Sequence, residues 1–195
     1  MASQLSEPSR TTTVRDSHLA GHSNAHLAGS SLQLVSFRLG NETFGVEITN
    51  VREIILVGEI TRLPETPAYV KGVINLRNTV IPVVDLRTRF GLPAIAANDE
   101  SRIMVVQLAG RLVGIVVDAV DEVFRVARDQ IAPPPETVKG VGREYLSGLV
   151  KLDAALLILL DIEHLLNSND RDAIEAATSR KQSAAAPATS VSGRK

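Results

Sequence analysis

The sequence predicts an all-β protein made of two small antiparallel barrels that are related to each other. Two observations lead to this prediction: short apolar runs separated by turn residues, and one pattern that occurs in both halves of the chain. Only 3% of the 195 residues are aromatic and none is tryptophan, so the core is expected to consist of Val, Ile and Leu. Because β-branched residues in short runs favour strands, the composition supports the same fold class.

The apolar runs come in pairs joined by small or polar residues, which is the pattern of β-hairpins. The joining residues are Gly40-Asn41, Arg77-Asn78, Ala109-Gly110 and Asp153-Ala154. Parallel strands need long crossover connections, usually helices, and no helical pattern of that kind lies between the runs. Closely spaced turns are instead typical of small closed barrels. Helix is expected only over residues 50–56 and from Ile162 into the 170s.

The two halves of the chain align with each other in the same order. Residues 39–54 match residues 108–123 without a gap at an offset of 69, and residues 69–86 match residues 145–162 at an offset of 76. The second half is therefore longer by seven residues, which we expect in the loop that holds Pro133 and its neighbouring prolines. Self-similarity of this kind is typical of duplicated structural units.

A residue type that occurs at matching positions in both halves is expected to serve the fold. The glycines are expected where a strand bulges or another strand approaches closely. The aspartates each end an apolar strand and are expected to be caps or turn-formers. The matched pairs are Gly45 and Gly114, Gly72 and Gly148, and Asp85 and Asp161.

The tips of two matching hairpins differ in charge, because Arg77 matches Asp153. The fold therefore does not require an arginine at this turn, which favours a docking role for Arg77. An alternative is an internal ion pair, with Glu53 for example, that only shapes the surface. Glu53 itself matches Glu122, which weakens a purely functional interpretation of Glu53.

Catalysis finds no support in the residues. The one histidine outside the N-terminal arm, His164, is interpreted as a helix-surface residue, and no carboxylate pair, nucleophile with a base, or phosphate-binding glycine loop is present. Outside the N-terminal arm no group has zinc- or calcium-ligand spacing, and neither a metal nor a cofactor is expected. A net charge of -1 gives no basic field for nucleic acid. A binding module is favoured; a small-ligand barrel or an enzyme with a pocket between the barrels stays open as the alternative.

Both ends of the chain have low-complexity composition and are expected to be a disordered arm over residues 1–31 and a disordered tail over residues 178–195. The arm contains His18, His22 and His26, whose spacing would place them on one side of a helix, as in a metal site. We interpret them as incidental histidines of a flexible arm. The chain shows neither an apolar signal core nor an apolar run of about 18 residues, so a cytoplasmic location without membrane insertion is expected.

Five segments together resemble the CheW family of bacterial chemotaxis coupling, or adaptor, proteins. They are VSFRLGNETFGVEITNVREI, TPAYVKGVINLRNTVIPVVDLRTRFG, LVGIVVDAVDEV, EYLSGLVKL and LILLDIEHLL. The resemblance covers residues 32–166, followed by an expected helical extension over residues 167–177. It implies two intertwined SH3-like five-stranded barrels. It also implies a scaffold without catalytic activity that links methyl-accepting chemotaxis receptors to the regulatory domain of the histidine kinase CheA. We expect a lone CheW-like domain, with neither the receiver domain of CheV nor the kinase core of CheA.

The resemblance also implies a partner-binding surface. The matching positions are Val51 and Glu53 in the expected short helix, Gly72 before the hairpin, and Arg77 and Asn78 at its tip. Asn78 departs from the family pattern, in which glycine is usual. Because Asn tolerates a positive φ better than most residues, the turn is expected to persist.

Overall fold

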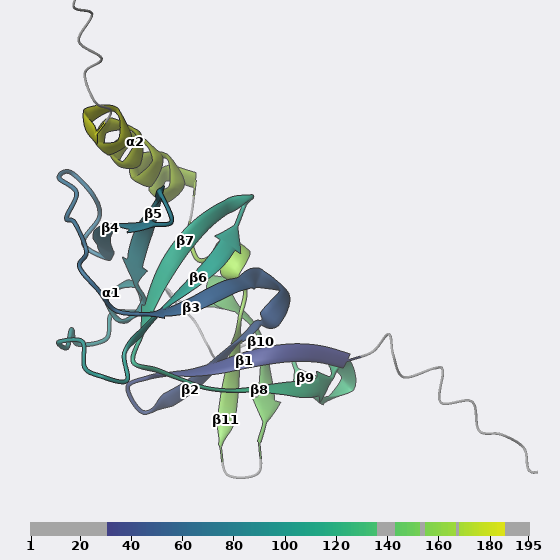
Figure 1. Ribbon diagram of the computed structural model, residues 1–195. Helices are drawn as coiled ribbons and strands as arrows, with labels where there is room; N and C mark the ends of the chain where they lie inside the picture. Colours follow the sequence, from purple (N-terminus) through teal and green to yellow (C-terminus); the bar gives the residue numbers. More distant parts are fainter. Residues whose placement is uncertain (1–30, 136–142, 153–154, 167, 186–195) are drawn as a thin grey trace, which may run out of the picture.

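The computed structural model describes residues 31–135, 143–152, 155–166 and 168–185 (Figure 1). The arm with its three histidines, the hairpin tip at Asp153 and residues 186–195 lie outside the described residues.

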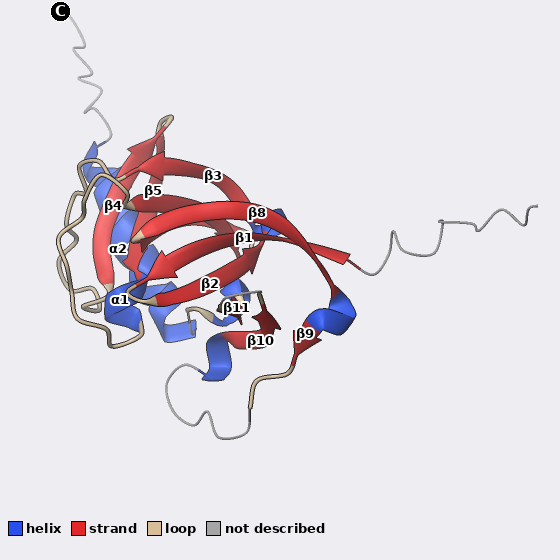
Figure 2. Ribbon diagram, turned by 90° about the horizontal axis from the view of Figure 1, so that it is seen from below, coloured by secondary structure: helices blue, strands red, loops and turns tan. Residues whose placement is uncertain are grey.

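The strands form two sheets, each curled into a small barrel. Barrel A has the strand order β8 (Ala119–Ala127), β1 (Ser31–Leu39), β2 (Glu42–Glu47), β11 (Leu156–Leu160), β10 (Leu146–Lys151) and β9 (Ile131–Ala132). Barrel B has the order β3 (Val51–Leu56), β6 (Arg102–Leu108), β7 (Arg111–Val117), β5 (Thr79–Asp85) and β4 (Val70–Leu76). The fold is therefore mostly strand, as predicted, and Figure 2 shows the helices at the margins of the sheets.

The helical elements are short except for the last one. They are the single-turn η2 (Ile48–Asn50), η3 (Arg128–Gln130), η4 (Arg143–Tyr145) and η5 (Ile162–His164), the helix α1 (Leu86–Arg89) and the helix α2 (Ser168–Ala185). Helix α2 ends at Ala185, beyond the expected helical extension over residues 167–177 and within the expected tail over residues 178–195. The boundary predicted between helix and tail is wrong to that extent.

The two halves exchange hairpins, which is why the barrels are intertwined. The first-half hairpin β1–β2 lies in barrel A among second-half strands, and the second-half hairpin β6–β7 lies in barrel B among first-half strands. Even the parallel registers match: Gly45 pairs with Leu159, and their counterparts Gly114 and Val83 pair with each other. These pairs obey the sequence offsets of 69 and 76, so the predicted duplication is confirmed in the strand ladder.

Each barrel closes through the segment that follows its outer strand, which is β3 in barrel B and β8 in barrel A. In barrel B, Thr61 bridges Val73 of β4, and in barrel A, Ala132 of β9 pairs with Leu149 of β10. The offset between these equivalent positions is 71, so most of the seven extra residues lie between Ala132 and Tyr145, as expected for the proline-containing loop.

One core cluster joins the two barrels. Its members are mostly Val, Ile and Leu, as the composition predicts. A line of aromatic rings runs through it from Phe37 through Phe44 and Phe90 to Tyr145, with centroid separations of 5.8–5.9 Å. Because the cluster contains residues of both barrels, such as Val35 of β1 and Val106 of β6, the barrels share one packed interior and are expected to fold together.

The paired aspartates cap helices, as predicted. Asp85 accepts hydrogen bonds from the backbone N–H groups of Arg87 and Thr88 at the start of α1. Asp161 accepts a hydrogen bond from the N–H group of Glu163 at the start of η5. Each cap satisfies backbone donors that have no partner within the helix, so the aspartates serve the fold.

The prediction of a helix over residues 50–56 is wrong. Only η2, over Ile48–Asn50, is helical, and Val51–Leu56 is strand β3, antiparallel to β6. Burial along β3 alternates residue by residue, which is the two-residue period of a strand with one face on the core. Val51 and Glu53 therefore lie on a strand and share its inward-leaning side.

Candidate functional site

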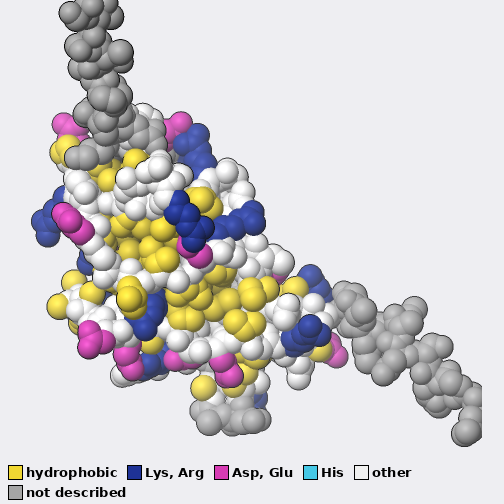
Figure 3. All heavy atoms as spheres, in the orientation of Figure 1, with side chains coloured by type: hydrophobic (Ala, Val, Ile, Leu, Met, Phe, Trp, Pro, Cys, Tyr) yellow, Lys and Arg dark blue, Asp and Glu magenta, His cyan; other side chains and the backbone are white. Residues whose placement is uncertain are grey.

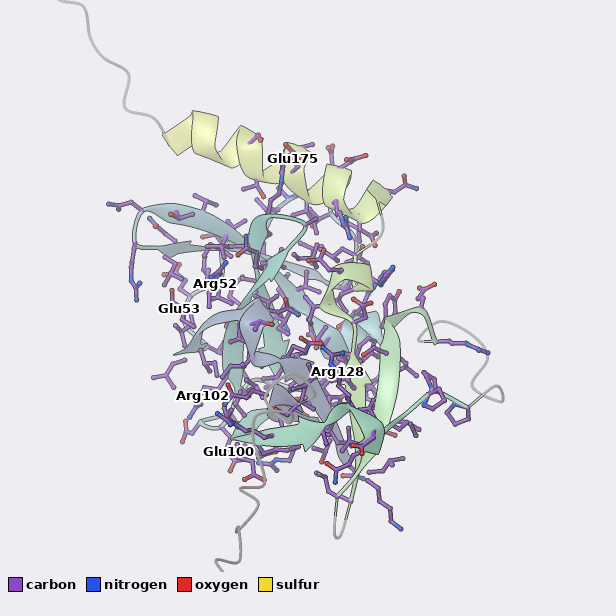
Figure 4. All side chains as sticks on the ribbon, turned by 90° about the vertical axis from the view of Figure 1, so that its right-hand side faces the viewer. Arg52, Glu53, Glu100, Arg102, Arg128 and Glu175 are labelled. Atoms are coloured by element: carbon purple, nitrogen blue, oxygen red, sulfur yellow. The ribbon has the colours of Figure 1, made fainter. Side chains whose placement is uncertain are left out.

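The candidate surface lies on barrel B where β3 faces the hairpin of β4 and β5. Strand β3 supplies Val51 and Glu53, and the hairpin supplies Arg77 and Asn78 at its tip. Nη2 of Arg77 lies 3.0 Å from Oε2 of Glu53, and the two side chains are 81% and 27% exposed. Figure 4 shows Glu53, beside Arg52, on the side of barrel B that carries this hairpin. The structure thus joins Glu53 and Arg77, which are 24 residues apart in sequence.

The hairpin tip is a two-residue turn with both central residues in the left-handed region. Arg77 has a φ of 50° and Asn78 a φ of 66°, the pattern of a type I′ turn. Asn is well suited to such a position, so the turn persists without the family's glycine, as predicted. The backbone aims Arg77 across the seam toward β3, where it meets Glu53.

Gly72 takes part in the site only through its backbone, because it is buried at a β-bulge and has no side chain to offer. Its φ is 144°, and a Cβ atom at this position would lie 2.1 Å from the carbonyl oxygen of Thr61. The chain that follows β3 therefore crosses directly over Gly72. The absence of a side chain at Gly72 lets that segment pair with β4, where Thr61 and Val73 exchange two backbone hydrogen bonds.

Val51 is half-buried and packs against the core cluster, so little of it faces solvent. The exposed apolar residues of β3 are Ile54, 41% exposed, and Leu56, 69% exposed. Sequence reasoning missed both because it assigned this segment to a helix. In a strand, side chains alternate between its two sides, so with Val51 and Glu53 facing inward Ile54 and Leu56 would be expected to face solvent. Figure 3 shows hydrophobic side chains gathered over the centre of this face, interrupted by a few charged ones.

A largely buried ion pair lies at the other end of barrel B from the hairpin tip, where α1 follows β5. Nε and Nη2 of Arg87 each lie 2.8 Å from an oxygen of the Asp118 carboxylate, and the amide of Gly40 donates to Asp118 at 2.7 Å. Burial alone would raise the pKa of Asp118, but the hydrogen bonds from Arg87 and Gly40 outweigh it and leave the pKa lowered. The bidentate geometry ties α1 to the end of β7 and to the first hairpin.

A second largely buried arginine, Arg89, joins the two halves. The guanidinium of Arg89 lies 4.5 Å from the ring centre of Tyr69 and 5.1 Å from that of Tyr145, its counterpart in the other half. Arg89 also pairs with Asp170 of α2 at 3.1 Å. Burial, followed by a hydrogen bond to Glu144, raises the pKa of Tyr145 to about 12. This cluster anchors α2. The raised pKa of Tyr145 comes mainly from its burial at this junction.

The chemistry available at the candidate surface is recognition. Among the described residues no group of three or more His, Cys, Asp or Glu side chains is placed to hold a metal ion. A hollow of about 580 Å³ lies between α2 and strands β5 and β7, so it belongs to barrel B and not to the junction between the barrels. The described part of the chain contains no helix long and apolar enough to cross a membrane.

The fold defines a class first: a module of two intertwined barrels, with the charged pair of Glu53 and Arg77 where β3 meets the β4–β5 hairpin. Residues 33–170 match the CheW-like domain family. The chain is 40% identical over 146 residues to the chemotaxis protein CheW of Klebsiella aerogenes, covering 74% of this chain and 88% of that protein. It is 35% identical over 142 residues to the chemotaxis protein CheW of Treponema pallidum, covering 71% and 84%.

A solved structure agrees with the sequence relatives. The crystal structure of the scaffolding protein TtCheW from Thermoanaerobacter tengcongensis superposes with a TM-score of 0.67 at 36% identity, covering 71% of this chain and 94% of that chain. The chain belongs to the CheW-like domain family, whose members are scaffold and adaptor proteins of chemotaxis and not enzymes.

Proposed function

We propose that this chain couples methyl-accepting chemotaxis receptors to the regulatory domain of the histidine kinase CheA and is recruited with them to signalling arrays. The docking surface comprises Glu53 and Arg77 with the exposed apolar residues Ile54 and Leu56, and Asn78 holds the tip in shape. Val51 and Gly72 support this surface from the core side. The observation that carries the proposal is the Arg77 side chain, which is 81% exposed although it is paired with Glu53.

The exposure of Arg77 decides between docking and a purely internal ion pair. An exposed pair contributes only about 0–1 kcal/mol to stability, so shaping the barrel is a weak reason for Arg77 to be present. A guanidinium carries five N–H donors, and the pair with Glu53 engages only Nη2. The remaining donors can bind a partner's carboxylate or carbonyl groups while Glu53 holds the side chain in register.

Apolar area beside the pair supplies the rest of the contact. Ile54 and Leu56 are exposed on β3 and alternate with Glu53, so they lie on the outward side of the strand while Glu53 leans toward the hairpin at the edge. An apolar centre with a charged pair at its edge is typical of protein interfaces, where charge sets register and apolar burial sets affinity. Moderate affinity is sufficient for such contacts, because an array multiplies them through avidity.

The direct test is Arg77→Ala, measured by titration calorimetry against purified CheA regulatory domain and against a receptor signalling-tip fragment. We expect weaker binding to at least one of them by about 1 kcal/mol or more, as for interface arginines. Arg77→Lys restores part of the loss, because lysine lacks the planar fork. The matched control is Arg111→Ala, since Arg111 is also an exposed arginine of barrel B paired with a glutamate. Unchanged affinity of Arg77→Ala for both partners would rule out docking through this residue.

A second candidate function is binding of a small ligand in the hollow of about 580 Å³ under α2. It is lined by Val80, Pro82 and Leu112 from barrel B and by Arg171 and Glu175 from α2. A ligand that binds only the folded state raises the melting temperature at saturating concentration. Thermal-shift measurements with nucleotides and other small metabolites separate this function from the scaffold, for which no such rise is expected.

A further inference from the structure

The duplication predicts a second docking face, because one face of barrel A lacks the helix that covers its counterpart on barrel B. On barrel B, α2 lies over β5 and β7 (Figure 1). Its Ile174 is only 5% exposed and belongs to the core cluster, together with Val113 of β7. Its Glu175 binds the guanidinium of Arg111 on β7, with Oε2 2.7 Å from Nη1. Helix α2 thus docks with an apolar residue followed by an acidic one.

The matching face of barrel A lies on β2 and β11. The offsets of the duplication place Leu156 at the position of Val80, and Ile158 at that of Pro82. Leu156 is 53% exposed, whereas Val80 is half-buried, and Ile158 is half-buried, whereas Pro82 is buried. The equivalent apolar positions are therefore more exposed where α2 is not present.

The first half of the chain does not supply a substitute for α2. In the second half, α2 follows η5, and the equivalent segment of the first half follows α1. That segment instead packs on barrel B, where Ile95 and Ser101 border a small hollow with Lys71 and Asp85. Figure 1 shows α2 at one end of the molecule and β2 and β11 at the other. Within the described residues, no helix covers the outer end of the β2–β11 face at Glu42 and Leu156, whereas Phe44 further along β2 is buried and stacks on Phe90.

The charge at this face is opposite to that on barrel B. The residue equivalent to Arg111 is Glu42, because Arg111 pairs with Leu108 in the β6–β7 hairpin as Glu42 pairs with Leu39 in the β1–β2 hairpin. Glu42 is exposed, and no ion pair with it is found among the described residues. If a helix bound this face as α2 binds barrel B, its residue at the position of Glu175 would lie against the carboxylate of Glu42.

We propose that the β2–β11 face, defined by Glu42, Leu156 and Ile158, binds an amphipathic helix of a partner protein that carries an aliphatic residue followed by Lys or Arg. The aliphatic residue takes the place that Ile174 has on barrel B, and the cation pairs with Glu42. A second copy of this chain is disfavoured, because its Glu175 would face Glu42 with like charge. The face lies on the other barrel from Glu53 and Arg77, so it does not depend on the docking surface proposed above.

The test uses two synthetic peptides with the sequence of residues 168–185, one natural and one carrying Glu175→Lys, titrated into the full ¹⁵N-labelled chain by NMR. The Glu175→Lys peptide is expected to shift amides of β2 and β11 and to bind about two- to five-fold more tightly than the natural peptide, as for exposed ion pairs. Glu42→Arg reverses that preference. Leu156→Asp abolishes the shifts, whereas Leu56→Asp, on a comparably exposed leucine of barrel B, leaves them unchanged.

Three outcomes contradict the proposal. A preference for the natural peptide would assign the face to a second copy of the chain. Shifts confined to β5 and β7 would mean that the peptide displaces α2 on barrel B. Absence of shifts on β2 and β11 with either peptide, at concentrations up to the millimolar range, would show that the face does not bind a helix.

Discussion

Gly72→Ala is expected to destabilise the protein severely, because the chain leaves no room for a Cβ atom at this bulge. That atom would lie 2.1 Å from the carbonyl oxygen of Thr61, 2.7 Å from its carbon and 3.0 Å from Cα of Arg62. All three are backbone atoms, so no side-chain rotation relieves the clash. The segment at Thr61 must move away from β4.

The magnitude follows from what this movement breaks. Thr61 and Val73 exchange two backbone hydrogen bonds, at 2.9 and 2.8 Å. Their loss costs about 1–3 kcal/mol at about 0.5–1.5 kcal/mol each. Alanine at a φ of 144° adds backbone strain, about 1–3 kcal/mol for a residue held in a region that glycine occupies. The unfolding free energy is therefore expected to fall by about 2–6 kcal/mol in urea melts.

Two other glycines make the measurement specific. Gly58 is in the same connection, and an added Cβ atom there meets nothing within 4 Å, so Gly58→Ala is expected to be neutral or slightly stabilising. Gly148 is the counterpart of Gly72, but its nearest obstacle is the Ile131 side chain, which can rotate. Gly148→Ala should therefore cost less than Gly72→Ala. A Gly72→Ala protein within about 1 kcal/mol of the wild type would refute the reasoning.

Three further changes test the fold and the electrostatics. Gly114→Val is expected to cost about 1–3 kcal/mol by overpacking, because a Cβ atom there already lies 2.8 Å from Cγ2 of Ile103; a neutral urea melt would contradict this. Asp118 has a lowered pKa in the folded state, so its stabilising effect is present above the unfolded pKa of about 3.9 and is lost as the pH falls through the lowered value. Asp118→Asn should therefore make the unfolding free energy less dependent on pH in the acid range, and an unchanged acid profile would exclude this contribution. Asp161→Ala removes the cap of η5 and is expected to cost about 1 kcal/mol in thermal melts, whereas an unchanged melting temperature would show that the cap is dispensable.

Much of the fold could be predicted from sequence because it is encoded locally and twice. Hairpin turns, capping aspartates and bulge glycines each depend on a few neighbouring residues, and the match between halves distinguished fold requirements from chance. Gly72 and Gly148 do lie at matching bulges, and Asp85 does cap α1. The exchange of hairpins between barrels was implied only by the family resemblance, because local pattern does not specify which distant strands pair.

The error at residues 50–56 has a physical cause. Val51, Ile54 and Ile55 follow one another at helical spacing, so the segment fits an amphipathic helix as well as a strand. Pairing with β6 stabilises the strand. Because β6 is distant in sequence, the local pattern does not reveal this pairing. With the strand misassigned, the exposure of Ile54 and Leu56 could not be predicted. The proximity of Glu53 and Arg77 could be suggested only as one alternative.

The central claim is that partners recognise the Glu53–Arg77 pair, and exchanging the two charges tests it most directly. The double variant Glu53→Arg/Arg77→Glu keeps an ion pair across the seam but reverses its polarity toward a partner. Titration calorimetry with CheA regulatory domain and receptor-tip fragment should show that the double variant, folded as stably as the wild type, still binds at least one of them about ten-fold or more weakly, a loss of about 1.4 kcal/mol. Recovery of wild-type affinity for both partners in the double variant, after loss in each single variant, would contradict the claim and show that the pair acts only within the barrel.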